Sequence, residues 1–322
     1  MVERSFVRRP FSLSSRSKFL KRDREGVAST VGTLMALLVF LTLITMFTNT
    51  YIPIWMKENE KSHMDEVLTQ FSDMKSKVDI LIVNAQVTQR PTIDMYQPIA
   101  MGSDAIPIFA SATAGYMSLK PAGTYDSGVN ITFNYEYLTT VRSVSEEGGG
   151  AVEFYAPNRY YVAQWFNYEN GALMVFQQEG MVMRATPSLV FSLNGDGTLN
   201  VQFDQVDIIG SNDTIAGQGN AGINIDLIYH DSQTYEICDA AGAQESGQLV
   251  LKFTTRYNTV WESFINDTAE AAGLVEGTNY TLSSAPLVGY DEYRPIYVLT
   301  LTINNVNDFT HNRAYVMMEL EY

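Results

Sequence analysis

The side chains best suited to chemistry are few and isolated in this sequence of 322 residues. The three histidines, His63, His230 and His311, lie far apart along the chain, and Cys238 is the only cysteine. We therefore expect packing or surface roles for the histidines and a buried, apolar role for Cys238. A single cysteine excludes an intramolecular disulfide and a zinc site built from several cysteines.

The short motifs of common enzymes are missing from the sequence. It contains no G-x-S-x-G elbow, no Walker A sequence, no HExxH and no G-x-G-x-x-G placed between a strand and a helix. The run Asn194-Gly195-Asp196-Gly197 has a faint likeness to a calcium loop, but it lacks the alternating ligands and the distal glutamate. We interpret it as a hairpin turn and predict no enzymatic activity, no cofactor and no metal site.

Four Asn-x-Ser/Thr sequons offer sites for covalent modification, at Asn130, Asn212, Asn266 and Asn279. All four lie after residue 90. N-glycans require exposed loops in an exported protein, and chance alone supplies one or two sequons in a chain rich in Asn and Thr. We expect roughly two of the four to be used.

Charge is distributed unevenly along the chain, which indicates a membrane topology. Residues 1–26 carry eight basic and three acidic side chains, and no charged residue lies between Glu25 and Lys57. Residues 27–47 are uncharged and mostly apolar, and they span about 31 Å as a helix, the thickness of a bilayer core. The basic flank precedes the span, so residues 1–26 are expected in the cytoplasm and everything after residue 57 outside.

The junction between the leader and the apolar run has a pattern of its own, KRDREG followed by VASTVGTLMALLVF. It resembles the class III signal of archaeal type IV pilins and archaellins. In those families a prepilin-type peptidase cuts after the glycine and leaves the apolar helix on the mature chain, which implies a cut between Gly26 and Val27. One departure is Val31, since bacterial pilins carry Glu at that place. The alternative is an uncleaved signal anchor in which Gly26 has no role.

Residues 58–89 have the pattern of an amphipathic helix that ends before Pro91. Their apolar side chains recur in steps of three and four, at Met64, Val67, Leu68, Phe71, Met74, Val78, Leu81, Ile82 and Ala85. Charged residues, Glu60 among them, occupy the other positions and form the predicted polar face of the helix. Pilin-like subunits are built on such a helix, with an apolar first half and a one-sided second half. A plain stalk docked on its own head fits the same pattern.

The remainder of the chain has the two-residue alternation of β-strands, as in residues 131–137, 223–229, 249–253 and 297–303. Turn signals such as Glu169-Asn170-Gly171 separate the strands. A phase slip in the alternation predicts a β-bulge near Asp204. We predict about ten strands, one helix near residues 260–272 and an antiparallel β-sandwich. Residues 152–210 also resemble a group of archaeal membrane-anchored proteins with a pilin-type start, a stalk helix and a β-rich ectodomain.

The acidic composition of residues 91–322 limits the classes of partner that this part of the chain can bind. From residue 91 on there are 27 acidic and 8 basic side chains. This excess keeps an extracellular surface soluble and argues against binding to nucleic acid. A hydrophobic content of 46% excludes a disordered chain.

The sequence therefore predicts a mainly β protein with a long N-terminal helix. Its parts are a cytoplasmic leader (residues 1–26), a transmembrane helix (27–56), an amphipathic stalk (57–90) and an extracellular sandwich (91–322). We expect a pilin-like structural subunit that crosses the cell membrane once or enters an extracellular filament. Its partners would be the membrane, a prepilin-type peptidase and copies of itself or other pilin-like subunits. The alternative is an anchored extracellular binding module that does not polymerise.

Overall fold

The computed structural model describes residues 16–88, 93–124, 126–239, 246–287 and 294–322, and the backbone alone for residues 16–26. Part of the predicted leader (1–15) and Pro91 lie outside the described residues. The chain divides into two compact units, Met1–Trp55 and Met56–Tyr322. The prediction of a long N-terminal helix followed by an antiparallel β-sandwich is confirmed.

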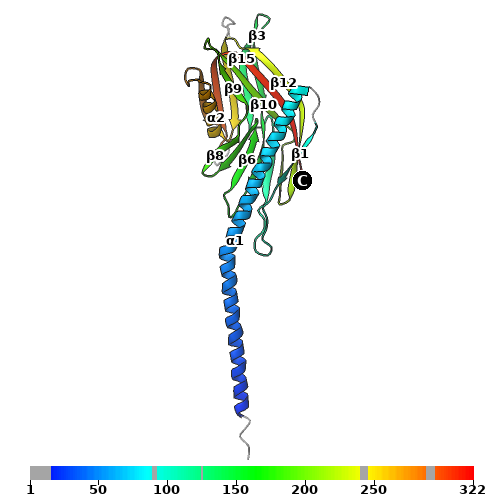
Figure 1. The fold of residues 1–322 in the computed structure, drawn as a ribbon, viewed down its shortest axis with the longest axis vertical. Coiled ribbons are helices and arrows are strands. Elements are labelled where there is room, and N and C mark those ends of the chain that lie inside the picture. The colour runs from blue at the N-terminus through cyan, green and yellow to red at the C-terminus, as the bar shows by residue number, and fades with distance from the viewer. Residues whose placement is uncertain (1–15, 89–92, 125, 240–245, 288–293) are drawn as a thin grey trace, which may run out of the picture. The chain divides into compact units, whose positions relative to one another are not determined.

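Helix α1 runs from Arg16 to Thr88 and belongs to both units. In the second unit it has the predicted amphipathic form, because Met64, Phe71 and Val78 are all buried against the strands. The apolar side chains follow steps of three and four, so one face of the helix is continuous with the core. This part of α1 is colored light blue to cyan in Figure 1.

Two β-sheets form the head (Figure 1). The larger sheet has nine strands: β1 (Met95–Ala100), β3 (Gly128–Tyr137), β4 (Thr140–Gly148), β9 (Leu189–Leu193), β10 (Leu199–Ile209), β12 (Asn220–Glu236), β13 (Gly247–Thr255), β14 (Tyr280–Pro286) and β15 (Tyr297–Glu321). The smaller sheet has six, in the order β11 (Asp213–Gly217), β2 (Gly115–Pro121), β5 (Gly150–Ala156), β6 (Gln164–Glu169), β7 (Ala172–Gln177) and β8 (Gly180–Ala185).

The long strand β15 connects the two halves of the larger sheet. Its first part, up to Val306, pairs with β13 and β14, and its second part pairs with β10 and β12. The change of partners falls beside Asn305, whose φ of 61° is in the left-handed region. The β10–β15 pair is parallel, whereas the other strand pairs between described residues are antiparallel. The predicted antiparallel sandwich thus holds one parallel pair.

Each half of the head has its own hydrophobic core. The first core lies between the smaller sheet, β12 and the end of β15, and α1 fills it. Phe71 of α1 stands 6.3 Å from Phe154 and 6.2 Å from Phe166, measured between ring centroids. The stalk is therefore part of the core, and burying a side chain such as Phe71 contributes about 1.5–3 kcal/mol.

The second core is covered by helix α2 (Asn258–Ala271), which confirms the predicted helix near residues 260–272. Trp261 is buried there and stacks on Phe253 of β13 at 4.7 Å between centroids. Its indole N–H donates to the buried carboxyl group of Glu169, 2.8 Å away. Burial raises the pKa of Glu169. The bond ties α2 to the β6–β7 turn, where Asn170 has the positive φ expected of an Asn-Gly hairpin.

The predicted bulge near Asp204 is wrong. Strand β10 keeps a regular register with β15 from Asn200 to Ile209. The phase slip arises because β10 passes from one core to the other: Phe203 packs in the second core and Val206 in the first. Both faces of the strand are covered at this crossing, so alternation stops without an inserted residue.

The buried His311 of β15 predicts an acid-sensitive contribution to stability. Burial, and then the neighbouring Arg313, lower the pKa of His311 to about 4. The unfolded chain binds this proton near the ordinary pKa of about 6.5. The contribution of His311 to the free energy of unfolding is therefore fully present above pH 6.5. It is lost as the pH falls from 6.5 to 4, by about 3 kcal/mol at most. We expect His311→Gln to lose less stability between pH 7 and pH 4.5 than the parent chain does.

Thermal unfolding of both chains in detergent, followed by near-ultraviolet circular dichroism, measures this difference. The two chains share every carboxyl group, so the difference between their losses of stability reports His311 together with its contact to Glu146, whose Oε2 lies 3.5 Å from Nδ1. Equal losses of stability on acidification would contradict the assignment.

Candidate functional site

The predicted processing site lies on the N-terminal part of α1. Gly26 and Val27 are both helical, and the Val27 side chain is exposed. A peptidase that cuts this bond must first open a turn of helix, which a glycine makes less costly.

The apolar run that follows has the properties of a membrane span. Within the described residues, α1 is the one helix long and apolar enough to cross a bilayer. Its large side chains between Val27 and Met46 are exposed. Threonine hydroxyl groups in the run form hydrogen bonds with the backbone of the same helix. Thr42 and Thr45 donate to the carbonyls of Val39 and Leu41, each at 2.7 Å. No further polar partner is needed for those hydroxyls in an apolar medium.

A buried carboxylate joins α1 to the head at its entry to the second unit. Glu60 is fully buried, although the sequence pattern assigned it to the polar face. Oε2 accepts the backbone N–H groups of Tyr160 and Tyr161, each at 2.7 Å, and Oε1 accepts that of Arg159 at 3.0 Å. The Thr113 hydroxyl also donates to Oε1, at 2.7 Å. Four donors thus replace the water that a buried carboxylate loses.

His63 lies one turn further along α1. Its Nε2 is 2.9 Å from the carbonyl oxygen of Ala100, and therefore carries the proton. The buried Nδ1 has no hydrogen-bond partner among the described residues. Burial lowers the pKa of His63, so the ring packs as a neutral group against Phe154, 5.9 Å away between centroids.

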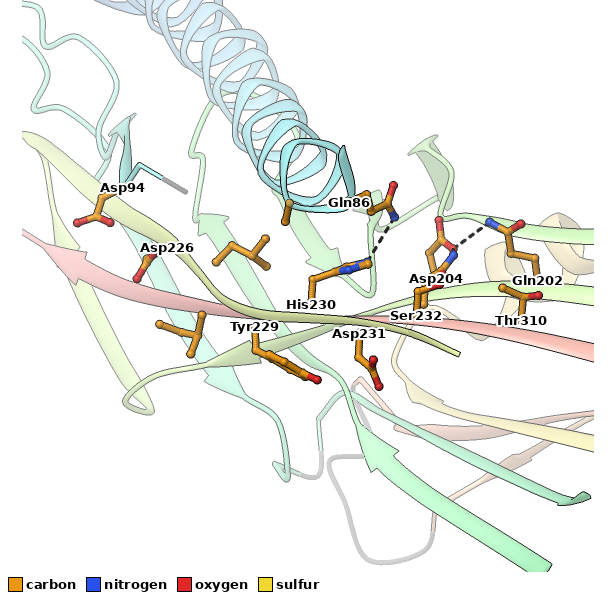
Figure 2. Close-up of a pocket in the computed structure, with 14 residues that line it drawn as sticks. Gln86, Asp94, Gln202, Asp204, Asp226, Tyr229, His230, Asp231, Ser232 and Thr310 are labelled. Atoms are coloured by element: carbon orange, nitrogen blue, oxygen red, sulfur yellow. Dashed lines mark hydrogen bonds between the residues drawn. The ribbon is translucent and has the colours of Figure 1, made fainter. Parts of the chain in front are cut away.

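A groove of about 1080 Å³ opens beside the last turn of α1, and Figure 2 shows the side chains that line it. They are mostly polar and come from α1, the residue before β1, and strands β10, β12 and β15. The lining residues that carry acidic side chains are Asp94, Asp204, Asp226 and Asp231. No basic residue other than His230 is among the groove residues, so acidic charge prevails in the groove.

The hydrogen bonds inside the groove fix several of these side chains. Asn312 donates to Asp204 at 2.6 Å, and Gln202 donates to the same oxygen at 3.2 Å. Gln86 and His230 are joined at 3.3 Å between Nε2 atoms. Burial lowers the pKa of His230, whereas the pKa of Asp226 is raised by burial and by the nearby Asp94.

The groove geometry does not assemble a nucleophile with a base. The Ser232 hydroxyl donates to Oδ1 of Asn312 at 2.6 Å, and His230 is engaged with Gln86. Across the described residues, no group of three His, Cys, Asp or Glu side chains is placed to hold a metal ion.

The four sequons occupy different environments. Asn212 is exposed in the loop before β11. Asn279 is half-buried in a turn, where its Oδ1 accepts the backbone N–H of Val275. Asn130 is half-buried in the paired strand β3, and Asn266 lies inside α2 with Oδ1 bonded to the Tyr280 hydroxyl. Only the first two stand in loops, which glycan attachment requires.

Two further sequence interpretations can be compared with the fold. Cys238 is buried, as predicted. The run Asn194-Gly195-Asp196-Gly197 joins β9 and β10 as the predicted hairpin. The sequence pattern did not predict the burial of Glu60, although its spacing indicates it. Met56, Glu60 and Met64 are four residues apart and lie on one buried face of the helix.

Comparisons of the chain with protein-family models, with curated proteins and with solved structures found no match.

The buried contacts of Glu60 predict that even a conservative substitution there lowers the stability of the head strongly. Glu60→Gln keeps the size of the side chain but replaces one acceptor oxygen by an N–H donor, so two of the four groups that donate to Glu60 lose their acceptor. We expect a loss of about 2–4 kcal/mol in the free energy of unfolding. The matched control is Glu66→Gln, an exposed position on the same helix, for which we expect a change below about 0.5 kcal/mol. Urea unfolding of the full chain in detergent measures both, and similar effects of the two substitutions would contradict the role of Glu60.

Proposed function

We propose that this chain is a pilin-like structural subunit of the cell surface. One observation carries the proposal: a single helix is largely apolar and exposed on every side between Val27 and Met46, and from Met64 on it is built into the core of a β-sandwich. The first part requires a covering of lipid or of identical helices, because water does not solvate it favourably. The second part fixes that helix to the head, so that packing of the helices would carry the head into an assembly.

The proposed location is the cell membrane, crossed once, with residues 1–26 in the cytoplasm and the head outside. The eight basic residues of the leader support this orientation. After a cut between Gly26 and Val27, the apolar helix would remain with the head and could leave the bilayer for a filament core. The proposed partners are the membrane, a prepilin-type peptidase and copies of this or other pilin-like subunits.

The groove beside the end of α1 favours a second candidate function, an anchored extracellular binding module that does not polymerise. Its four acidic side chains and the exposed Tyr229 provide contacts for a cationic or hydroxyl-bearing ligand. The two functions differ in the fate of the apolar helix, which would stay in the bilayer of a binding module.

Processing after Gly26 predicts a mature chain that begins at Val27. N-terminal sequencing and intact mass of the protein from native membranes measure this directly. We expect Gly26→Val to abolish the cut, because the peptidase pattern requires glycine. The matched control is Gly32→Ala, since a Cβ atom at Gly32 meets nothing within 4 Å, and its processing should be normal.

A chain that begins at Met1 or Val2 would overturn the processing step. A chain that begins at Val27 but remains monomeric, with no filaments in electron micrographs, would favour the binding module.

The proposed exported head predicts glycans at exposed sequons. We expect Asn212→Gln to lower the mass of the native protein by one glycan, and Asn279→Gln to have the same effect where that site is used. Asn266→Gln is the matched control, because its asparagine is held inside α2 and should carry no glycan. Intact-mass spectrometry of the three variants tests this, and a mass loss at Asn266 without one at Asn212 would contradict it.

A further inference from the structure

The head carries a hairpin with an apolar tip, which we call the apolar hairpin (residues 102–114). Bridges between Gly102 and Ala114 and between Ile106 and Ala110 close it. Residues 105–114 contain no charged side chain. At the tip, Ile108 is fully exposed and Phe109 is 48% exposed.

Ile108 is also unusual in its backbone, with a φ of 73°. A β-branched residue is disfavoured in this left-handed region, and an isoleucine in water gains nothing from its side chain. Glycine or asparagine would suit such a position in a solvated turn. The tip is therefore shaped to present an apolar side chain outward.

A second loop (residues 157–163) presents apolar side chains at the same end of the head. Tyr160 and Val162 are 40% and 46% exposed. The carboxylate of Glu60 holds this loop by the backbone N–H groups of residues 159–161, and it holds the base of the apolar hairpin by the Thr113 hydroxyl. Asn59 adds a bond from its Nδ2 to the carbonyl of Asp104, at 3.2 Å. Both loops are thus fixed to α1 at residues 59 and 60.

Chain length gives the level of this attachment relative to a bilayer. Residues 26–56 carry no charge and span about 46 Å as a helix. A bilayer with its headgroups is about 40–45 Å thick. Lys57 is the first charged residue after this run, so with residues 26–56 across the bilayer, residues 59 and 60 would fall at the outer headgroup surface.

The charges around the attachment fit lipid phosphates. Lys57, Lys61 and Arg159 are exposed here, next to the acidic Glu58 and Asp104. Arg159 is one of only eight basic residues after residue 91, in a head with 27 acidic ones. The three basic side chains outnumber the two acidic ones here, whereas the head as a whole is acidic, so this end is suited to an approach to phosphate groups.

We propose that the apolar hairpin and the 157–163 loop dock on the outer lipid surface, with Ile108, Phe109 and Tyr160 at the boundary between headgroups and acyl chains. The inference rests on the membrane-anchoring part of the proposed function. Aromatic and aliphatic side chains beside basic residues are suited to that boundary. The docked loops orient the head on the membrane before any assembly.

Spin labels in lipid nanodiscs test the docking on the full chain. Single cysteines are introduced in a Cys238→Ala background as Ile108→Cys, Val162→Cys, Val39→Cys and Leu138→Cys, with one chain in each phosphatidylcholine disc. Leu138 is the matched control for Ile108: it is 80% exposed, has a φ of 49°, and lies in the β3–β4 turn at the other end of the head (Figure 1). Circular dichroism of each labelled chain verifies that it is folded.

The measured quantity is the accessibility of each label to oxygen relative to a water-soluble nickel chelate. We expect a ratio severalfold higher at positions 39, 108 and 162 than at 138. A label at 108 as exposed to nickel as that at 138, with 39 in lipid, would overturn the docking alone. A label at 39 in water would overturn the anchoring itself. A label at 108 that is exposed to nickel in these single-chain discs but protected in discs that hold several chains would overturn lipid docking in favour of a contact between subunits.

Discussion

The buried carboxylate of Glu60 is the interaction on which the arrangement of the second unit depends. A charge without water is costly, and this one is compensated by four directed donors instead of a basic partner. A shift of α1 by one residue would turn Glu60 by about 100° and leave the carboxylate and its donors unpaired. The register of α1 in the head is therefore fixed.

The fixed register determines what surrounds the helix. It sets Phe71 between Phe154 and Phe166, and it brings Gln86 to the groove beside His230. Because α1 completes the first core, the two sheets alone would leave an apolar face open to water. Strand β15 then links that core to the second one. A displacement of the helix is consequently resisted by the whole head, a property suited to a subunit that is held by its helix.

The proposed functions use different ends of the same helix. Anchoring or assembly uses the apolar part, the proposed lipid contacts lie where α1 enters the head, and the acidic groove lies beside its last turn. A head that rests on lipid by the apolar hairpin would hold the groove away from the membrane, since some 25 helical residues, or about 38 Å, separate Glu60 from Gln86. Anchoring and ligand binding could therefore operate without competing for one surface.

The sequence by itself determined the features that depend on neighbouring residues: the apolar run, the stripe on α1, the Asn-Gly turn at Asn170 and helix α2. Helical and strand periodicity and turn preferences are local, so they can be read from one chain. Only the tertiary structure decided that Glu60 is buried, that β10 pairs in parallel with β15, and that the slip at Asp204 marks a passage between cores. These depend on partners about 100 residues away, such as Tyr160 for Glu60, and a local pattern holds no information on which distant backbone will face a given side chain.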